Sequence, residues 1–550
     1  MKKLNHIYLK LAVIISISLG MLSACKNEEN LELPYLFRPI NFAVELNKTV
    51  ATLTWAPVDS AKSYTLQISE DSLFNTVLID TTLDVLTFTK ELGGETKYFA
   101  QVRANASSEE KNSKFNSKLS FKTPKENIFT GFGTSNNTGT LYSAYMTGFN
   151  TLTVKWQPAA NVTHLILTSA DQSVKDSVSL SSSEMASGVA IVPSLVNSKW
   201  KVQIYNKTFL RGTTSGIVEG DVLLNAGDDL QAALNNASDG QTIVLAGNAV
   251  FNVGSGTYRF SKSVKLRGAS PSQRPVVCLT VGSGTPPSTT SSTLGFVEGS
   301  TIQSVKFENI DFTGYVDNST SSTKIGYLFN NNTLTTVSKL SFTNCNMHNF
   351  GNTPMRLQGG KNQVIDSLSM NGCIINDIGF SSTYAVVNTN SADLINAIEI
   401  TNSTIYNFKG SLILRTGQTL KSVKVTNCTI DQGMQDPGSS RYLMDFNTAS
   451  FTSEGVTIQN CIFGLTGNVK GANGIRYVAG TMYSNTGSYY TSDYVDDPIP
   501  AGTTSSSIKS SMTAYSGAST SLWKNTLNGD FGFSNSSFAG AKTAGDPRWR

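Results

Sequence analysis

The chain carries few charges and almost no histidine. Of its 550 residues, 15% are Asp, Glu, Lys or Arg, three are His, and the formal net charge at pH 7 is +4. A charge this small gives no global basic field, which is the usual electrostatic footprint of a nucleic-acid-binding protein. We therefore expect no nucleic-acid partner.

Cysteine is also scarce, and no two cysteines are spaced as zinc ligands. The six Cys form no Cys-x-x-Cys pair, and His348 is the one His near them. Structural zinc sites use paired Cys, or Cys and His, within a few residues of each other. The sequence therefore predicts no metal site and no bound cofactor.

Glycine and small polar residues are abundant instead. Gly numbers 45, and Ser, Thr and Asn recur in every region. This composition is typical of turn-rich β structure. Because 550 residues exceed what one core usually organises, we expect an all-β protein of two to four domains.

The first residues have the pattern of an export signal. Lys2 and Lys3 precede the apolar residues 11–21, a run too short for a comfortable membrane span. The next residues, "LSAC", resemble the lipobox of bacterial lipoproteins, which implies that residues 1–24 are removed and that Cys25 is lipidated. "KNEEN" then resembles the acidic surface-export tag of Bacteroidota lipoproteins. The alternative is an ordinary secretory signal with an incidental Cys.

The lipobox resemblance implies a location. Residues 25–38 would form a lipidated tether, and the protein would be anchored in the outer membrane by the lipid on Cys25 and exposed at the cell surface. Removal of residues 1–24 takes three Lys with it and lowers the formal charge from +4 to +1.

Two β-sandwiches are predicted before residue 218. Over residues 39–124, Trp55 and Tyr64 in "LTWAPVDSAKSYTLQIS", with Tyr98 in "LGGETKYFAQVRA", resemble the fibronectin type III family and its tyrosine corner. The Trp-Pro-strand arrangement returns at Trp156, which predicts a second sandwich over residues 125–217. Such domains space or bind rather than catalyse.

The pattern changes at about residue 218. A short amphipathic helix with Leu230 and Leu234 on one face precedes the strand "TIVLAG". This succession resembles the N-terminal cap and first coil of pectate-lyase-like right-handed parallel β-helices. We predict that fold, a pectin-lyase-like solenoid with an N-terminal cap helix, over residues 218–485, because a helix laid across the first coil hides its apolar end from water. A C-terminal capping region is predicted over residues 486–550, with these aromatic residues plugging the far end: Trp523, Phe531, Phe533 and Trp549.

A repeated motif locates the coils. Six strands align at Val305, Leu340, Leu368, Ile398, Val423 and Val456, separated by 35, 28, 30, 25 and 33 residues. The first and third positions of each motif are apolar, so these side chains should point inward. A constant motif with variable spacing is typical of a solenoid with loops of variable length.

Two columns follow the inward positions. The fifth motif position is Asn except at Gly372, which fits a left-handed bend with Asn side chains bonded from coil to coil. The sixth position is Ile310, Cys345, Cys373, Ser403, Cys428 or Cys461. Disulfides between coils are possible in an exported protein, but Ile and Ser in the same column favour a packed stack of reduced thiols.

A polar column is predicted on the strands that lie upstream of the motif. Each of these strands interrupts an apolar run with one polar residue, and the aligned ligand-binding candidates are Asn330, Arg356, Asn388, Arg415, Asp445 and Arg476. Guanidinium groups at every other coil, roughly 10 Å apart, would match two sugar residues along a polysaccharide. Arg pairs with carboxylates and Asn with hydroxyls, so a uronate-containing polysaccharide is the expected ligand, with Tyr327, Tyr384, Tyr442 and Tyr477 as stacking surface. The alternative is that these residues are simply solvated.

Catalysis is a second hypothesis. A lyase on this fold would use Arg356, Lys361 or Arg415 as the base and Ca²⁺ held by clustered acids, but the acids here are scattered singly over the coils. Polygalacturonases on this fold carry a paired-Asp motif and a catalytic His, whereas residues 300–480 contain no adjacent acids and only His348.

Taken together, the architecture resembles the surface lipoproteins of Bacteroidota polysaccharide-utilisation systems. The resemblance implies a glycan-binding protein that passes polysaccharide to an outer-membrane transporter complex. The alternatives are a polysaccharide lyase on the same scaffold and an adhesin-like structural protein.

Overall fold

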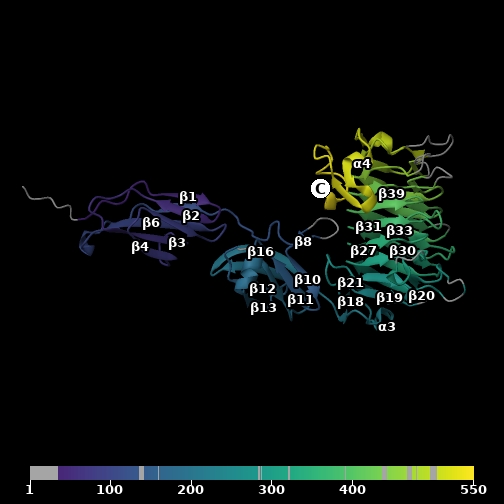
Figure 1. Cartoon of the computed structure of the whole chain (residues 1–550), viewed down its shortest axis with the longest axis horizontal. Coiled ribbons are helices and arrows are strands. Elements are labelled where there is room, and N and C mark those ends of the chain that lie inside the picture. Colours follow the sequence, from purple (N-terminus) through teal and green to yellow (C-terminus); the bar gives the residue numbers. More distant parts are fainter. Residues whose placement is uncertain are drawn as a thin grey trace, which may run out of the picture. The chain divides into compact units, whose positions relative to one another are not determined.

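The computed structural model describes residues 35–550 apart from 136–140, 159, 255, 283–284, 286–287, 320–322, 390–391, 437–441, 468–473, 478–479 and 496–504. The predicted signal peptide, Cys25 and most of the tether lie outside the described residues. The chain forms two compact units, one of residues up to Asn127 with Tyr205–Gly212, the other of Ile128–Ile204 with Thr213–Arg550 (Figure 1).

The first unit contains an antiparallel β-sandwich. One sheet has the order β1 (Ala43–Asn47), β2 (Val50–Thr54) and β5 (Thr87–Glu91), and the other has the order β4 (Ile79–Leu83), β3 (Ser63–Ser69), β6 (Lys97–Asn105) and β7 (Leu119–Lys122). Trp55 and Tyr98 are buried between them. The Tyr98 hydroxyl accepts a hydrogen bond of 2.9 Å from the Gly93 amide. This is the tyrosine corner that the sequence predicts.

A second sandwich opens the larger unit. Its sheets have the orders β10 (Ala144–Gly148), β11 (Thr151–Lys155), β14 (Val189–Val192), and β13 (Lys175–Ser179), β12 (His164–Ser169), β15 (Ser198–Asn206), β16 (Phe209–Val218). Trp156 and Trp200 are 1% and 0% exposed in its core. The same core includes Val244 and Ala269, which belong to the β-helix.

The rest of the larger unit is a right-handed parallel β-helix of three sheets, which confirms the predicted fold class. Sheet I contains β17 (Val222–Leu224), β18 (Gln241–Leu245), β21 (Val264–Gly268), β24 (Thr301–Glu308), β27 (Thr336–Thr343), β30 (Val364–Asn371), β33 (Leu394–Thr401), β36 (Thr419–Thr426), β39 (Ser450–Gln459) and β42 (Tyr483–Thr486). Sheet II contains β19 (Val250–Val253), β22 (Val276–Leu279), β25 (Asp311–Thr313), β28 (Asn346–His348), β31 (Ile374–Ile378), β34 (Thr404–Phe408), β37 (Thr429–Asp431), β40 (Ile462–Phe463), β43 (Tyr489–Tyr490) and β45 (Thr513–Ala514). Sheet III contains β20 (Thr257–Phe260), β23 (Thr293–Phe296), β26 (Tyr327–Asn331), β29 (Thr353–Leu357), β32 (Val387–Thr389), β35 (Ile413–Arg415), β38 (Met444–Asp445), β41 (Ile475–Arg476) and β44 (Ser505–Ser506).

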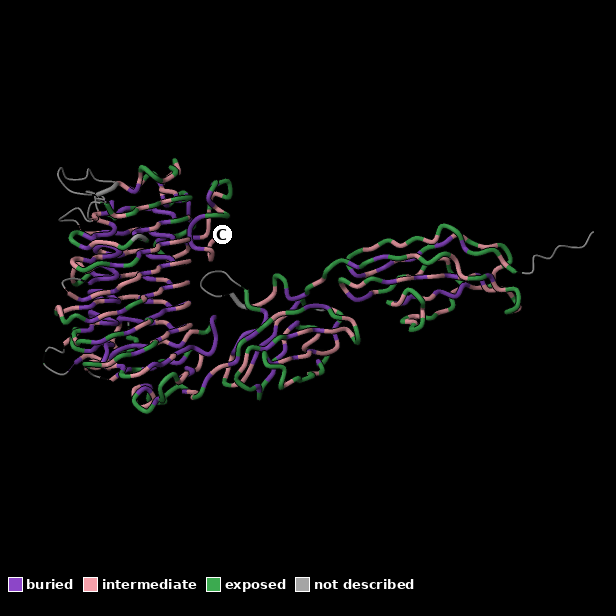
Figure 2. The backbone as a smooth tube through the Cα atoms, turned by 180° about the vertical axis from the view of Figure 1, so that it is seen from behind, coloured by how far each residue is buried: buried purple, intermediate pink, exposed green. Residues whose placement is uncertain are grey.

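The repeated motif lies in sheet I, in the register predicted from the sequence. Val305, Leu340, Leu368, Ile398, Val423 and Val456 are successive partners. All are at most 1% exposed, and buried positions recur along the coils in Figure 2. The inward apolar face is therefore confirmed.

The asparagines form the predicted bend between sheets I and II. Asn309, Asn344, Asn402, Asn427 and Asn460 have φ between 51° and 56°. The Asn344 amide donates to the Asn309 side-chain oxygen at 2.6 Å, and Asn427 donates to Asn402 at 3.1 Å. Amides therefore bond from coil to coil.

Gly372, the exception in the motif, also has a positive φ of 67°. Its neighbour Asn371 takes over the missing amide's role, because it accepts from the Asn402 side chain at 2.9 Å.

The next column is a buried stack of free thiols. Cys345, Cys373, Cys428 and Cys461 are 0% exposed and unpaired as disulfides. Each Sγ donates to a backbone carbonyl, as Cys428 does to Ile400 at 3.4 Å. Burial raises the pKa of Cys373 to about 12, so the thiol stays protonated. These cysteines pack the interior.

A helix covers the first coil, as predicted. α3 (Leu230–Asn236) begins at Asp229, whose side chain accepts from the Ala232 amide at 2.9 Å. Leu230 and Leu234 are 0% and 2% exposed and join the interior core of the β-helix.

The C-terminal aromatic residues lie on the side of the β-helix, so the prediction that they plug its far end is wrong. Here α4 (Ser519–Leu522), β46 (Trp523–Asn525), β47 (Asp530–Phe533) and the 3-10 helix η5 (Pro547–Trp549) form a layer with its own core. That core contains Trp523 and Phe531, together with Ile462 of sheet II. The Phe531 ring lies 5.3 Å from that of Tyr406 on β34. The physical reason is that sheet II presents large apolar side chains outward, and these need cover.

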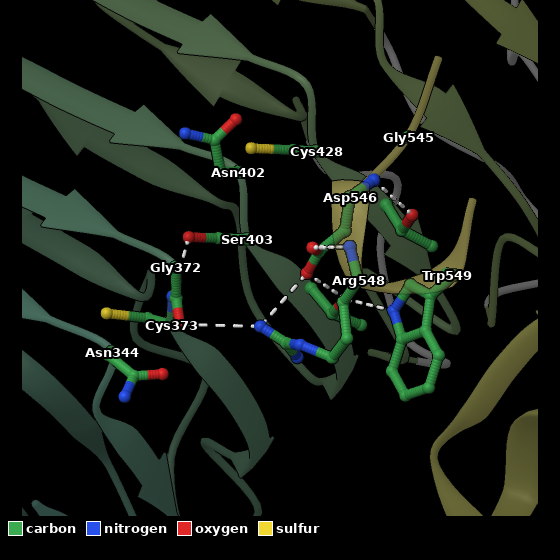
Figure 3. A network of polar contacts seen from close by, with 12 residues as sticks. Asn344, Gly372, Cys373, Asn402, Ser403, Cys428, Gly545, Asp546, Arg548 and Trp549 are labelled. Carbon is green, nitrogen blue, oxygen red and sulfur yellow. Dashed lines mark hydrogen bonds and ion pairs between the residues drawn. The ribbon is translucent and has the colours of Figure 1, made fainter. Parts of the chain in front are cut away.

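The last residues of this layer bond to several coils (Figure 3). The buried carboxylate of Asp546 accepts from the Thr404 hydroxyl at 2.7 Å and pairs with Arg548 at 3.1 Å. Arg548 also donates to the Gly372 carbonyl at 3.3 Å, and the Trp549 indole donates to Thr404 at 2.8 Å. Burial raises the pKa of Asp546 to about 6 although Arg548 opposes the shift.

Candidate functional site

The outer face of sheet III carries the predicted polar column with one change. Strand pairing places Asn330 beside Arg356, Arg356 beside Asn388, Asn388 beside Leu414, Leu414 beside Asp445, and Asp445 beside Arg476. Five of the six predicted residues therefore share one column.

Arg415 is the exception, and its predicted outward position is wrong. It pairs with Thr389, one residue out of the column, and is 0% exposed. Because side chains alternate along a strand, this shift turns the guanidinium inward. Arg415 donates to the Thr416 carbonyl, and burial lowers its pKa to about 10 while the charge of Asp393 opposes the shift. Arg415 is therefore no ligand contact or base on this face.

Arg356 lies between two tyrosines. Its guanidinium carbon is 4.5 Å from the ring centroid of Tyr384 and 5.4 Å from that of Tyr327. Its Nη1 donates to the Tyr327 hydroxyl at 2.9 Å. In the described part of the chain, no acidic side chain pairs with Arg356. We call Tyr327, Arg356 and Tyr384 the arginine cluster, a preoriented cation whose positive charge is not compensated by any acidic side chain that the structure describes.

Arg476 is different, because Asp445 neutralises it. Its Nε and Nη2 donate to the two Asp445 carboxylate oxygens at 2.7 and 2.6 Å. The guanidinium also lies 4.7 Å from the Tyr442 ring. A bidentate pair of this kind leaves little charge for a ligand carboxylate.

The predicted amides contribute unequally. Asn388 is 4% exposed and accepts from the Ala385 amide, so it offers little surface to a ligand. Asn330 is half-buried, and its side-chain oxygen has no hydrogen-bond partner among the described residues.

Arg259 belongs to the same column, and sequence reasoning missed it. It pairs with Gly295 on the next strand, which lies beside Asn330. Its Nη2 donates to Asn332 at 3.2 Å. The sequence signal is the alternation of Arg259 with the apolar residues Tyr258 and Phe260, both buried, but this coil precedes the first Asn motif, which sets the register of the other coils.

Lys361 lies in the turn after β29 and is exposed. Its backbone amide donates to the buried carboxylate of Asp393 at 2.8 Å, and the Gly360 amide does so at 3.0 Å. Asp393 therefore shapes this turn.

The acids that are scattered in the sequence remain apart in the structure. The described residues contain no group of three or more His, Cys, Asp or Glu placed to hold a metal ion.

A cavity of about 740 Å³ lies elsewhere in the larger unit, where β10 and β16 approach sheet I. Four of its five charged residues, all but Lys199, pair with one another. Glu219 contacts both Lys265 and Arg267, and Lys265 lies 2.9 Å from Glu308. The arginine cluster is therefore the better candidate for recognition of an anionic ligand.

Comparisons with known families cover the β-helix without assigning it a role. The profile of one domain of unknown function, DUF4957, matches residues 247–408, and that of another, DUF5123, matches residues 398–549. No curated protein matches the chain. Across the described residues, no helix is long and apolar enough to cross a membrane.

Fibronectin type III domains are among the solved structures found. A mutant of the domain FN3tt is 28% identical, with 16% of this chain and 94% of that chain covered and a TM-score of 0.14. A two-domain fibronectin type III segment of chicken tenascin is 17% identical, with 33% and 99% covered and a TM-score of 0.17. At these TM-scores the sandwich fold rests on the strand order and tyrosine corner of the chain itself.

Proposed function

We propose that this protein binds an acidic, uronate-containing polysaccharide on the outer face of sheet III. The observation that carries the proposal is the arginine cluster, in which Tyr327 and Tyr384 hold the guanidinium of Arg356 and no acidic side chain of the described residues pairs with it. A guanidinium of this kind pairs well with a carboxylate, and the half-buried side chain of Asn330 lies beside it on the neighbouring strand.

The setting of the site follows from the N-terminal sequence. The lipobox ending at Cys25 supports an outer-membrane lipoprotein exposed at the cell surface. In that position the β-helix would capture polysaccharide for an outer-membrane transporter complex, as expected of a glycan-utilisation system.

The test is affinity electrophoresis of the mature protein in gels containing pectins, alginates or glycosaminoglycans. We expect retardation by at least one acidic polymer, and Arg356→Gln should weaken it about tenfold or more because a charge-assisted contact is lost. Tyr384→Ala should weaken it too, since the guanidinium loses its support.

Lys339→Gln is the matched control. It removes one positive charge from an exposed position on β27 of sheet I and should leave retardation unchanged. Equal loss in Lys339→Gln and Arg356→Gln would contradict the site. Absence of retardation by every polymer would favour the adhesin hypothesis, and ultraviolet absorbance from unsaturated products in the presence of Ca²⁺ would show a lyase instead.

A further inference from the structure

The positive charges on sheet III are far apart. Neighbouring strands lie about 4.8 Å apart, so Arg259 and Arg356, three strands apart in the column, are separated by roughly 14 Å. Charges at this distance are largely screened from each other, since the Debye length is about 8 Å at physiological ionic strength. Each arginine therefore meets a ligand carboxylate separately.

The positions between and beyond these arginines carry no free cation among the described residues. Gly295 and Asn330 separate Arg259 from Arg356, and Asn388 and Leu414 follow. The next residue is Asp445, whose carboxylate is already paired with Arg476.

A polymer with a carboxylate on every sugar would fit this column poorly. Its additional carboxylates would lose water beside an amide or a leucine without gaining a partner, which is costly. One of them would also lie next to Asp445, whose carboxylate already occupies the guanidinium of Arg476.

Resting on the proposed function, we infer that the ligand is a heteroglycan in which neutral sugars separate the carboxylate-bearing ones. One carboxylate binds Arg356 in the arginine cluster. The neutral sugars on either side lie against Asn330 and the outward face of Leu414, and Arg259 meets a second, distant carboxylate.

The test compares two classes of polymer by titration calorimetry with the mature protein. Homogalacturonan and alginate carry contiguous uronates, whereas glucuronoxylan and gellan carry separated ones. Each is also used after reduction of its carboxylates to alcohols. We expect at least one polymer with separated uronates to bind about tenfold or more tightly than both polymers with contiguous uronates. Reduction of its carboxylates should remove most of that affinity.

Variants then locate the selectivity. Arg356→Gln should lower the affinity for the polymer with separated uronates to nearly that for its carboxylate-reduced form. Lys339→Gln should bind this polymer with the affinity of the wild type. Arg259→Gln, expected to weaken binding less, serves as the second variant should Arg356→Gln fail to fold.

The outcomes separate the two proposals. Tighter binding of contiguous polymers, or no effect of carboxylate reduction, would overturn the inference while leaving polysaccharide binding intact. No binding of any polymer would overturn the proposed function and the inference with it.

Discussion

Asn402 stands in the middle of the column of bends between sheets I and II. It combines a left-handed backbone, with φ of 51°, and two amide contacts, one to Asn371 at 2.9 Å and one from Asn427 at 3.1 Å. Asn is well suited to this place because it tolerates that backbone conformation better than most residues do. The bend and the bond between coils therefore depend on the same side chain.

Two substitutions at this position separate the two contributions. Asn402→Gly keeps the backbone conformation and removes the amide, so we expect a loss of about 1–2 kcal/mol in the free energy of unfolding. Asn402→Ala also forces an alanine into the left-handed region, which adds about 1–2 kcal/mol. Urea denaturation measures both, and equal losses in the two variants would contradict the role given to the backbone.

Among the elements, the C-terminal layer is the least expected from the sequence. It covers the outer face of sheet II through Trp523 and Phe531, and its last residues end in a buried ion pair. Asp546 is 0% exposed at its side chain and Arg548 is 9% exposed. A pair buried this deeply is costly to break on one side only.

Removal of one partner should show this cost. Asp546→Ala leaves the Arg548 charge buried without its carboxylate, and we expect a loss of about 3–5 kcal/mol in unfolding free energy, with early proteolysis of residues 519–550. The double variant Asp546→Ala, Arg548→Met should recover part of the loss. A double variant less stable than Asp546→Ala would contradict the importance of the unpaired charge.

The sequence predicted sheet I far better than sheet III, for a physical reason. In sheet I, the left-handed bend at Asn309, Asn344 or Asn427 follows each strand at a constant distance, so inward positions can be counted back from it. Before sheet III, the left-handed residues are Asn349, Asp377, Asn407 and Gln432, so no single residue type marks the bend, and the loops that follow vary in length. A polar residue within an apolar run predicts an outward side chain there, and this prediction is wrong where Leu414 faces out and Arg415 is buried.

The contacts of the site were beyond sequence reasoning as well. The neutralisation of Arg476 by Asp445 depends on the two residues being on neighbouring strands, and the support of Arg356 by Tyr384 depends on the path of a loop. The repeat in the sequence predicts which residues share the outward column of sheet III. It does not predict which of the charged side chains in that column have a partner of opposite charge.

In the whole molecule, the proposed recognition surface and the expected anchor are separated along the chain by both sandwiches. The arginine cluster belongs to the β-helix, whereas Cys25 precedes the first sandwich. Anchoring and recognition should therefore be separable by single substitutions.

Cys25→Ser tests the anchor. Without the thiol no lipid can be attached, and we expect the protein to move from the membrane fraction to the soluble fraction of the cell envelope, with loss of labelling by a fatty-acid precursor. The purified variant should bind polysaccharide as the mature protein does. Persistence of both membrane association and labelling in Cys25→Ser would contradict lipidation at this residue.

The C-terminal layer also bears on how the solenoid comes apart. Coils in a solenoid hold only their nearest neighbours, but this layer bonds at once to Gly372, Thr404, Asn427 and Asn460 and so ties several coils together. Under heat or a pulling force, we expect the coils before Gly372 to unfold first, beginning at the end covered by α3. The coils that the C-terminal layer connects should unfold later. Arg356 lies in the last coil before the coils that this layer connects. A polysaccharide bound at Arg356 would therefore contact the protein at the boundary between the coils that unfold first and the coils that unfold last.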